Sequence, residues 1–388
     1  MNAESSLQGS REEFPMFNKK GVFWYLGLTF GLSWLLNLVL YLRGGLDAPG
    51  ATHVLQLQMM VPAFSAILLG LFTLPQSPIY LRPLGGPRRP AGRGRWFYYF
   101  YLLLIAAMVF IALGALLAPA AMPPAIAYAP QLLSVLGLLA LVVLRFAAGR
   151  QAMARVWLAW GNWRYWLLFG LAFFAYYVLQ AVLNAVTGLG SAHLGPDLTP
   201  PGASSGTYLI LGTLQVLAAS ILGIVIGFGE EYGWRGYLQN ELFKLGRVRG
   251  VLLMGVIWGV WHWPVILMGL DYPDHPLLGA ALFLFYATCL GIFLGYAVLK
   301  SGSVLLAAFL HALNNTALGV IQLMGFTPFD NAFSFIGIYG VVPLAIIALL
   351  VLRDPVWRGK GSNLAQPVPA SAAMAVSGDP GAVEKAAD

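Results

Sequence analysis

Long apolar blocks, separated by short polar connections, run along most of this 388-residue sequence. A helix needs about 20 apolar residues to cross the roughly 30 Å hydrocarbon layer of a bilayer, and most of the blocks approach or reach that length. Backbone groups in lipid must bond within their own segment, which favours helices over open strands. The pattern therefore predicts about ten membrane-spanning helices, at 22–42, 54–74, 96–118, 131–147, 165–187, 208–234, 251–268, 277–299, 303–323 and 333–352.

The composition agrees with this prediction. Hydrophobic residues make up 59% of the chain and charged residues only 10%, with a mean hydropathy of +0.76. Soluble domains contain about 45–50% apolar and about 25% charged residues. The single cysteine, Cys289, excludes an intrachain disulfide framework and a cysteine metal cluster. The predicted fold class is an all-α, polytopic transmembrane helical bundle.

Lysine and arginine are concentrated in alternate connections, which sets the predicted orientation because basic connections stay in the cytoplasm. The 75–95 and 148–164 connections are basic, and both chain ends share their side of the membrane. The net charge of +7 is then explained by the anionic cytoplasmic leaflet, so membrane lipid is the expected partner and nucleic acid is not. The Gly-, Ala- and Pro-rich composition suggests a bacterial origin, so we expect a multi-pass protein of a bacterial inner membrane with both termini cytoplasmic. Four predicted outer connections contain no lysine or arginine: 119–130, 188–207, 269–276 and 324–332.

Ionisable residues inside apolar spans are the strongest functional signal. A charge at the centre of a spanning helix costs about 2.5–3.5 kcal/mol on the insertion scale and commonly marks a pathway or a site. Of fifteen acidic residues, only Glu230 and Glu231 lie inside a predicted span. Two of the five histidines, His262 and His311, lie in later spans, and Asn315 follows His311 by four residues.

Helical geometry separates the two glutamates. Glu231 and Arg235 are four residues apart and share a helix face, so they can form an ion pair. Glu230 is rotated about 100° from Glu231 and has no such partner. A carboxylate in a low dielectric is a weaker acid unless it is countered, which makes Glu230 a candidate general base near neutral pH.

The histidines and the asparagine complete a candidate site. His311 and Asn315 project from one helix face and can donate hydrogen bonds to developing negative charge. His262 stands just before Pro264, which should kink its helix. His262, His311 and Glu230 all lie roughly 12–17 Å from the cytoplasmic end of their spans, at 1.5 Å per residue. The three spans therefore place their unusual residues at one depth, which predicts one polar site.

Structural interpretations compete with this one. The Glu231–Arg235 pair can serve only to orient helices, each histidine can be a packed core residue, and Asn315 can cross-link helices through hydrogen bonds. Three small-xxx-small patterns predict close packing of the sixth, seventh and eighth spans. These patterns run over 223–227, 255–259 and 291–295.

The segment from Glu230 to Arg235, EEYGWR, resembles the Glu-Glu-x-x-x-Arg motif of the type II CAAX prenyl endopeptidase family. These are intramembrane proteases, and their bacterial branch is also called the CAAX protease and bacteriocin-processing family. The family's second motif ends in a histidine that follows an aromatic residue by four positions. His262 meets this motif, with Trp258 where phenylalanine is common.

The third family motif, His-x-x-x-Asn, is met by His311 and Asn315, so all three motifs occur in order across about 90 of the 388 residues. The resemblance implies hydrolysis of a peptide bond inside a helical cavity. Glu230 and His262 would activate the attacking water. His311 and Asn315 would stabilise the oxyanion. The expected substrate is a membrane-associated or lipidated peptide or protein.

The resemblance also implies that Glu231 and Arg235 support the site. No cofactor is favoured, and the metal question is left open because the family has also been treated as metalloproteases. Zinc, if present, would be held by Glu230, His262 and His311, a His₂Glu shell with one position open for water.

The chain then divides into four parts: a cytoplasmic arm at 1–21, helices at 22–200 that would be accessory, a catalytic core at 201–352 and a disordered cytoplasmic tail at 353–388. Two other functions are open. One is a bacteriocin-immunity or scaffold protein of the same family that acts by binding alone. The other, less favoured, is a transporter with Glu230 as proton relay, although the inverted repeats of such proteins are not evident in the sequence.

Overall fold

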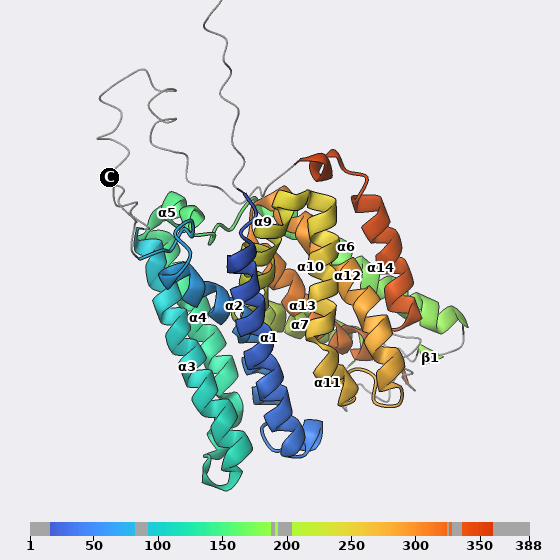
Figure 1. Ribbon diagram of the computed structural model, residues 1–388. Helices are drawn as coiled ribbons and strands as arrows, with labels where there is room; N and C mark the ends of the chain where they lie inside the picture. Colours follow the sequence, from blue (N-terminus) through green and yellow to red (C-terminus); the bar gives the residue numbers. More distant parts are fainter. Residues whose placement is uncertain are drawn as a thin grey trace, which may run out of the picture.

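The chain folds into a bundle of helices (Figure 1). The computed structural model describes residues 16–81, 92–187, 191–192, 204–323, 326–327 and 336–359. Within this part of the chain the only strands are β1 (Ser191–Ala192) and β2 (Phe326–Thr327), which pair antiparallel. The predicted all-α class is therefore confirmed. The α-helices are α1 (Lys19–Leu42), α2 (Ala51–Phe72), α3 (Trp96–Leu117), α4 (Ala129–Ala147), α5 (Gly149–Arg155), α6 (Trp163–Thr187), α7 (Ser205–Leu222), α8 (Ile224–Glu231), α9 (Gln239–Leu242), α10 (Arg247–Trp261), α11 (Trp263–Leu267), α12 (Pro276–Ser301), α13 (Val304–Leu323) and α14 (Ile338–Val351).

Several apolar helices are long enough to cross a bilayer, but the prediction of about ten spans is not confirmed. Among the described residues five helices qualify by length and composition, or six if the pair formed by Ile210–Leu222 and Ile224–Leu245, bent by 49°, counts as one span. Helix breaks account for part of the difference. The predicted span 208–234 is broken at Gly223, and the predicted span 251–268 is broken at His262. An apolar block therefore does not always form one continuous helix.

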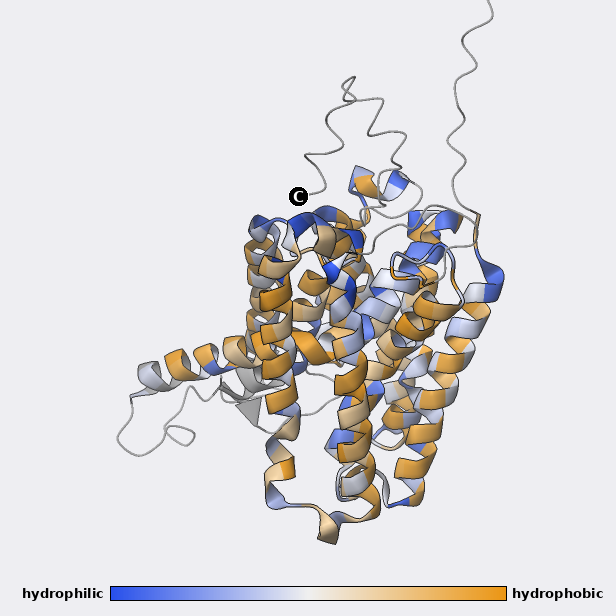
Figure 2. Cartoon of the chain, turned by 90° about the vertical axis from the view of Figure 1, so that its left-hand side faces the viewer, coloured by the Kyte–Doolittle hydropathy of each residue, from blue (hydrophilic) through white to orange (hydrophobic). Residues whose placement is uncertain are grey.

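The outer surface and the ends of the bundle match a membrane setting. In Figure 2 the hydrophobic colour dominates along the helices, and hydrophilic residues gather near the upper end. At this end the backbone N–H of Asn18 donates to Glu241 (3.1 Å), and Arg247 donates to the carbonyl of Val356. The start of α1 and the short 3₁₀ helix η8 (Pro355–Arg358) thus lie on the same side of the bundle. This agrees with termini on one side, while the cytoplasmic orientation stays a prediction.

Some predictions fall outside the described residues. They concern the arm at 1–15, the basic residues of the 82–91 connection and the tail from residue 360. The boundaries of the four predicted parts also stay predictions.

Glycines let the helices that carry the polar residues approach one another closely. A Cβ atom on Gly227 of α8 would lie 2.7 Å from the carbonyl oxygen of Ala308 on α13. A Cβ on Gly255 of α10 would lie 2.7 Å from the Cα of Thr288 on α12. Real Cβ atoms do not come this close to backbone, so only glycine fits at both crossings. The small-xxx-small patterns therefore mark close packing, as predicted, but the pattern of the sixth span packs against α13 in the ninth span, whereas those of the seventh and eighth spans pack against each other.

The variant Gly227→Ala is expected to destabilise the protein. The added methyl must push α8 away from the α13 backbone, and overpacking of this kind costs about 1–3 kcal/mol. Gly27→Ala on α1 is the matched control, because nothing lies within 4 Å of a Cβ there. The Gly27→Ala variant should be as stable as the wild type, or more stable because alanine has the higher helix propensity. Thermal unfolding in detergent checks both; equal midpoints for the two variants would contradict the close crossing.

The connection between α11 and α12 contains a carboxyl group that burial makes a weaker acid. Burial raises the pKa of Asp271 from 3.8 to about 6. The folded pKa is above the unfolded one, so stability from this group is present at low pH and is lost as the pH rises through about 6. Its backbone φ of 65° is a conformation that asparagine also tolerates.

We therefore expect Asp271→Asn to gain stability relative to the wild type as the pH rises from 4 to 8. The gain should be on the order of 1–3 kcal/mol, because each pKa unit corresponds to about 1.4 kcal/mol. Unfolding midpoints measured across this pH range test it. The exposed neighbour Asp274 gives the control, Asp274→Asn, which should follow the wild-type pH dependence. Parallel curves for Asp271→Asn and the wild type would show that the carboxyl is not desolvated.

Candidate active site

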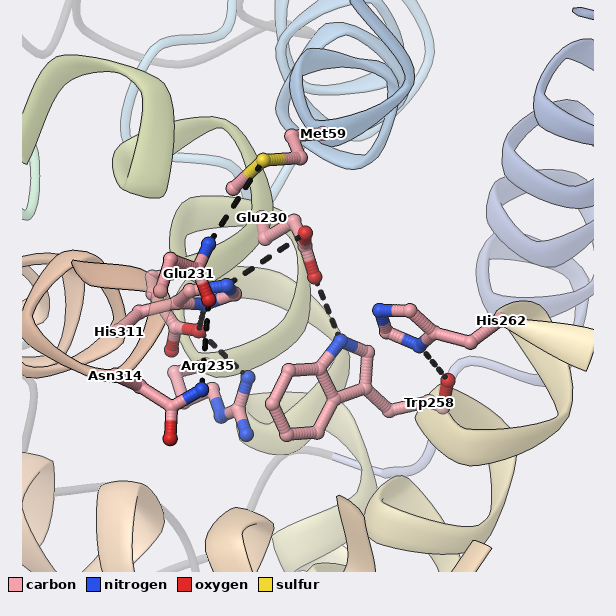
Figure 3. A network of polar contacts seen from close by, with 9 residues as sticks. Met59, Glu230, Glu231, Arg235, Trp258, His262, His311 and Asn314 are labelled. Atoms are coloured by element: carbon pink, nitrogen blue, oxygen red, sulfur yellow. Dashed lines mark hydrogen bonds and ion pairs between the residues drawn. The ribbon is translucent and has the colours of Figure 1, made fainter. Parts of the chain in front are cut away.

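Three separate segments bring the predicted polar residues together in the interior of the bundle (Figure 3). The glutamate pair ends α8 and is followed by η6 (Tyr232–Leu238), a π-helical segment that contains Arg235. His262 lies at the break between α10 and α11, and His311 lies within α13. π-helical turns inside α-helices occur frequently at functional sites. The structure thus brings residues of three segments to one place, while their depth in a membrane stays a prediction.

Glu230 is buried, with 1% of its surface exposed, and one of its carboxylate oxygens is held by a hydrogen bond. The indole Nε1 of Trp258 donates to its Oε2 at 2.7 Å. Its Oε1 lies 3.7 Å from Nε2 of His311. Glu230 does not form an ion pair with Arg235 in the described structure, as its rotation away from Glu231 predicted. One carboxylate oxygen is thus fixed by a neutral donor, and the other faces a histidine.

Glu231 is the centre of a fully buried charged network. Nη1 of Arg235 donates to its Oε1 at 2.8 Å, so the ion pair predicted from the spacing is present. Nδ1 of His311 lies 2.7 Å from the same oxygen. The guanidinium carbon of Arg235 also lies 4.2 Å from the ring centroid of Trp258, a cation–π contact. Buried ions need such partners, because desolvation of an unpaired charge costs several kcal/mol.

His262 is oriented by its own backbone. Its Nδ1 lies 2.8 Å from the carbonyl oxygen of Trp258. A carbonyl oxygen only accepts, so Nδ1 must carry the proton, and in the neutral ring Nε2 is an acceptor. Figure 3 shows this other ring nitrogen turned toward the carboxylate of Glu230. The helix break that frees His262 lies two residues before Pro264, where the sequence predicted a kink.

Asn315 lies at the edge of the site and is exposed, with its Nδ2 4.0 Å from Sδ of Met59. Its neighbour Asn314 is buried, a residue that sequence reasoning left without a role. The hydroxyls of Tyr177 and Tyr286 donate to Oδ1 of Asn314 at 2.7 and 2.5 Å. Nδ2 of Asn314 then donates to Oδ1 of Asn315 at 3.4 Å. These bonds turn the amide oxygen of Asn315 inward and its NH₂ group toward Met59.

Helix α2 forms one wall of the site, a contribution that the sequence motifs did not indicate. A Cβ atom on Gly229 would meet the carbonyl oxygen of Met59 at 2.5 Å, and one on Gly233 would meet Pro62 at the same distance. These glycines flank the glutamate pair on both sides. Their spacing was the available signal, because small residues at this interval commonly admit a neighbouring helix.

The candidate zinc ligands Glu230, His262 and His311 each have one donor atom engaged by another group. Zinc needs its nitrogen and oxygen ligands within about 2.0–2.2 Å of one point. Oε2 of Glu230 is bonded to Trp258, and Nδ1 of His262 and of His311 are each occupied by a hydrogen bond, which leaves Oε1 of Glu230 and Nε2 of both histidines as the atoms that would hold zinc. Among the described residues there is no group of three or more His, Cys, Asp or Glu side chains that could hold a metal ion. The steps proposed below use no metal, and the cofactor prediction stays a prediction.

Comparison with protein families finds one match. Residues 212–317, which run from α7 into α13 and include all the predicted site residues, match the family model described as "Type II CAAX prenyl endopeptidase Rce1-like". Searches of curated proteins and of solved structures gave no match. The matched segment includes the buried glutamate pair, His262, His311 and Asn315. By this match, residues 212–317 form an Rce1-like type II CAAX prenyl endopeptidase domain.

Proposed function

We propose that this protein is an intramembrane endopeptidase in which Glu230 and His262 activate the attacking water. The observation that carries the proposal is the environment of Glu230: a buried carboxylate, bonded to a neutral indole N–H at 2.7 Å and not bound to the nearby guanidinium. Arg235 is instead paired with Glu231 at 2.8 Å. Glu230 is therefore the carboxylate of the pair that is not engaged by the guanidinium, and it is the one placed to accept a proton from water as a general base.

The reaction follows from these contacts. Trp258 holds Oε2 of Glu230 and leaves Oε1 to remove a proton from water. The acceptor nitrogen of His262 faces the same carboxylate and orients this water. The hydroxide then attacks the carbonyl carbon of the scissile peptide. When the carbon–nitrogen bond breaks, Glu230 returns its proton to the departing amine, so the carboxylate is restored and one water is consumed.

The tetrahedral intermediate carries a negative oxygen that needs donors. Asn315 offers its Nδ2, which faces Met59 and is not fixed by a strong acceptor. His311 offers its Nε2, because its Nδ1 lies 2.7 Å from Oε1 of Glu231 while Nε2 is 3.7 Å from Oε1 of Glu230, beyond hydrogen-bond distance. A hydrogen-bond donor at this position typically stabilises the transition state of acyl transfer by about 3–4 kcal/mol.

The setting favours a substrate that reaches the site from the membrane. The candidate site lies inside a bundle whose helices expose large apolar side chains, among them Phe110, Leu171 and Phe285. A membrane-associated or lipidated peptide or protein can bring its scissile bond to such a site, and membrane lipid is the surrounding partner. We place the protein in the inner membrane of a bacterium with both termini cytoplasmic.

Cleavage by the purified protein tests the proposal. Membrane-anchored peptides are incubated with the reconstituted wild type, with and without a strong chelator, and new termini are identified by mass spectrometry. We expect cleavage at defined positions that is unaffected by the chelator. Loss of cleavage with the chelator would replace the glutamate mechanism by a metal mechanism. Binding of peptides without new termini would favour the immunity or scaffold function.

A further inference from the structure

The buried face of α1 is polar, the reverse of what a membrane helix normally presents. Its buried positions between Val22 and Leu40 are Tyr25, Thr29, Ser33 and Asn37, each four residues from the next and none more than 2% exposed. Side chains at this spacing share one helix face. The outward positions are apolar, for example Phe23, Trp24, Leu35 and Leu38, which are 52–69% exposed.

These buried polar groups have few hydrogen-bond partners among the described residues. The hydroxyl of Ser33 and both amide atoms of Asn37 have none, and the hydroxyls of Tyr25 and Thr29 have only each other. Helical hydroxyls elsewhere do find partners: Ser220, Thr288 and Ser301 each donate to the carbonyl oxygen four residues earlier, at 2.7–2.8 Å. A buried polar group left unpaired costs about 1–3 kcal/mol. This line of residues therefore has more buried donors and acceptors than it has partners within the described protein.

The line of polar groups continues toward the candidate active site. The hydroxyl of Tyr25 lies 2.6 Å from where a Cβ on Gly233 would be, three residues after Glu230. The Tyr25 ring packs edge-on against Trp234, and Trp234 packs edge-on against Trp261, the neighbour of His262. The indole N–H groups of both tryptophans are buried and also unpaired.

The packing of α1 agrees with this course. Its Trp34 donates to the carbonyl oxygen of Trp261 at 3.3 Å. Helix α1, the blue helix at the right of Figure 3, passes on the His262 side of the network. On α2, which packs against α1, the buried side chains of Gln58 and Ser65 carry oxygens that are unpaired as well.

We propose that a file of bound water molecules occupies the interior beside α1, from Asn37 to Tyr25, and supplies water to Glu230. Twelve residues of helix span about 18 Å, so the file would run through much of the hydrocarbon depth. A buried water makes about three hydrogen bonds to otherwise unsatisfied polar groups, and this face offers donors and acceptors one turn apart. The supply role rests on the proposed hydrolysis, which consumes one water at each turnover. The presence of water beside α1 does not depend on that proposed function.

Radiolytic hydroxyl-radical labelling tests the hydration without any substrate. Ionised water labels the side chains beside it, including those that bulk solvent cannot reach. Tyr25 is compared with Tyr101, which is equally buried but donates its hydroxyl to the carbonyl of Val225 at 2.9 Å. We expect Tyr25 to be labelled at least about fivefold faster. Equal, slow labelling of the two tyrosines would overturn the proposal.

The variant Thr29→Val/Ser33→Ala removes two hydroxyls with little change of shape. If water binds them, labelling of Tyr25 should fall toward the rate of Tyr101, and the unfolding midpoint should stay the same or fall. A clear rise of the unfolding midpoint would mean that the two hydroxyls bind no water and form no hydrogen bond in the wild type. That result would refute the proposed row of water molecules. The same variant should lower kcat for peptide cleavage several-fold at unchanged KM.

The outcomes separate the two proposals. Fast labelling of Tyr25 with unchanged kcat in the double variant would overturn the supply role. A wild type that cleaves no peptide would contradict the proposed function, while the labelling would still decide whether water lies beside α1.

Discussion

Glu230→Gln should reduce kcat/KM for peptide cleavage by about 10²–10⁴-fold, the usual contribution of a general base. The amide is the same size as the carboxylate, and its oxygen can still accept from Nε1 of Trp258, which lies 2.7 Å from Oε2 in the wild type. The fold should therefore be retained, and the loss should report the missing base. Initial rates on a membrane-anchored peptide, at matched protein concentration and with unfolding midpoints recorded in parallel, provide the measurement.

Glu241→Gln is the matched control. Glu241 lies at the end of the bundle, where it pairs with Lys244 at 2.8 Å and accepts from the backbone N–H of Asn18, away from the site residues. Its substitution should leave cleavage unchanged. Full activity in purified Glu230→Gln would eliminate Glu230 as the base. If instead the wild type protects a cell by binding alone, Glu230→Gln should protect equally well, which would identify the immunity or scaffold function.

Arg235→Met should cause the largest loss of stability, about 3–5 kcal/mol, which is the usual result when one partner of a buried ion pair is removed. Glu231 and Arg235 are both fully buried, so the remaining carboxylate would stay in a low dielectric with only His311 beside it. Unfolding in detergent, followed by heat or by denaturant, gives the measurement. Cleavage should also fall, because His311 and Trp258 both contact this network.

Two further variants make this result specific. Glu231→Gln/Arg235→Met removes both charges and should be less destabilised than Arg235→Met alone. Lys300→Met breaks a more exposed pair with Asp354, at 3.0 Å, and should cost at most about 1 kcal/mol. If Arg235→Met is no less stable than Lys300→Met, the buried pair does not hold the site together.

The polar site was largely predictable from the sequence, because its residues are rare in apolar spans and their spacing fixes their faces. The offset between Glu230 and Glu231 predicted which of them pairs with Arg235, and the structure contains that pair. The bond from Trp258 to Glu230 was not predictable, since it joins residues 28 positions apart through an indole that sequence alone assigns to packing.

The number of membrane spans was harder to predict for a different reason. Hydropathy counts apolar residues and does not detect breaks, and both Gly223 and His262 interrupt apolar blocks. The polar face of α1 also escaped notice, because four residues spaced along 24 hardly change the average hydropathy of a helix. Whether these four residues are buried or exposed depends on which face of α1 is turned inward. Only the packing of the helices shows this.

The contact of α2 with Gly229 and Gly233 limits how far this protein can be shortened. The backbone of Met59 and the proline at 62 back the segment that carries both glutamates. A fragment restricted to the family-matched region would leave that segment against lipid, with its glycines uncovered. We therefore expect the smallest fragment that keeps this segment packed to reach back to the beginning of α2 at Ala51, more than 150 residues before the family match begins.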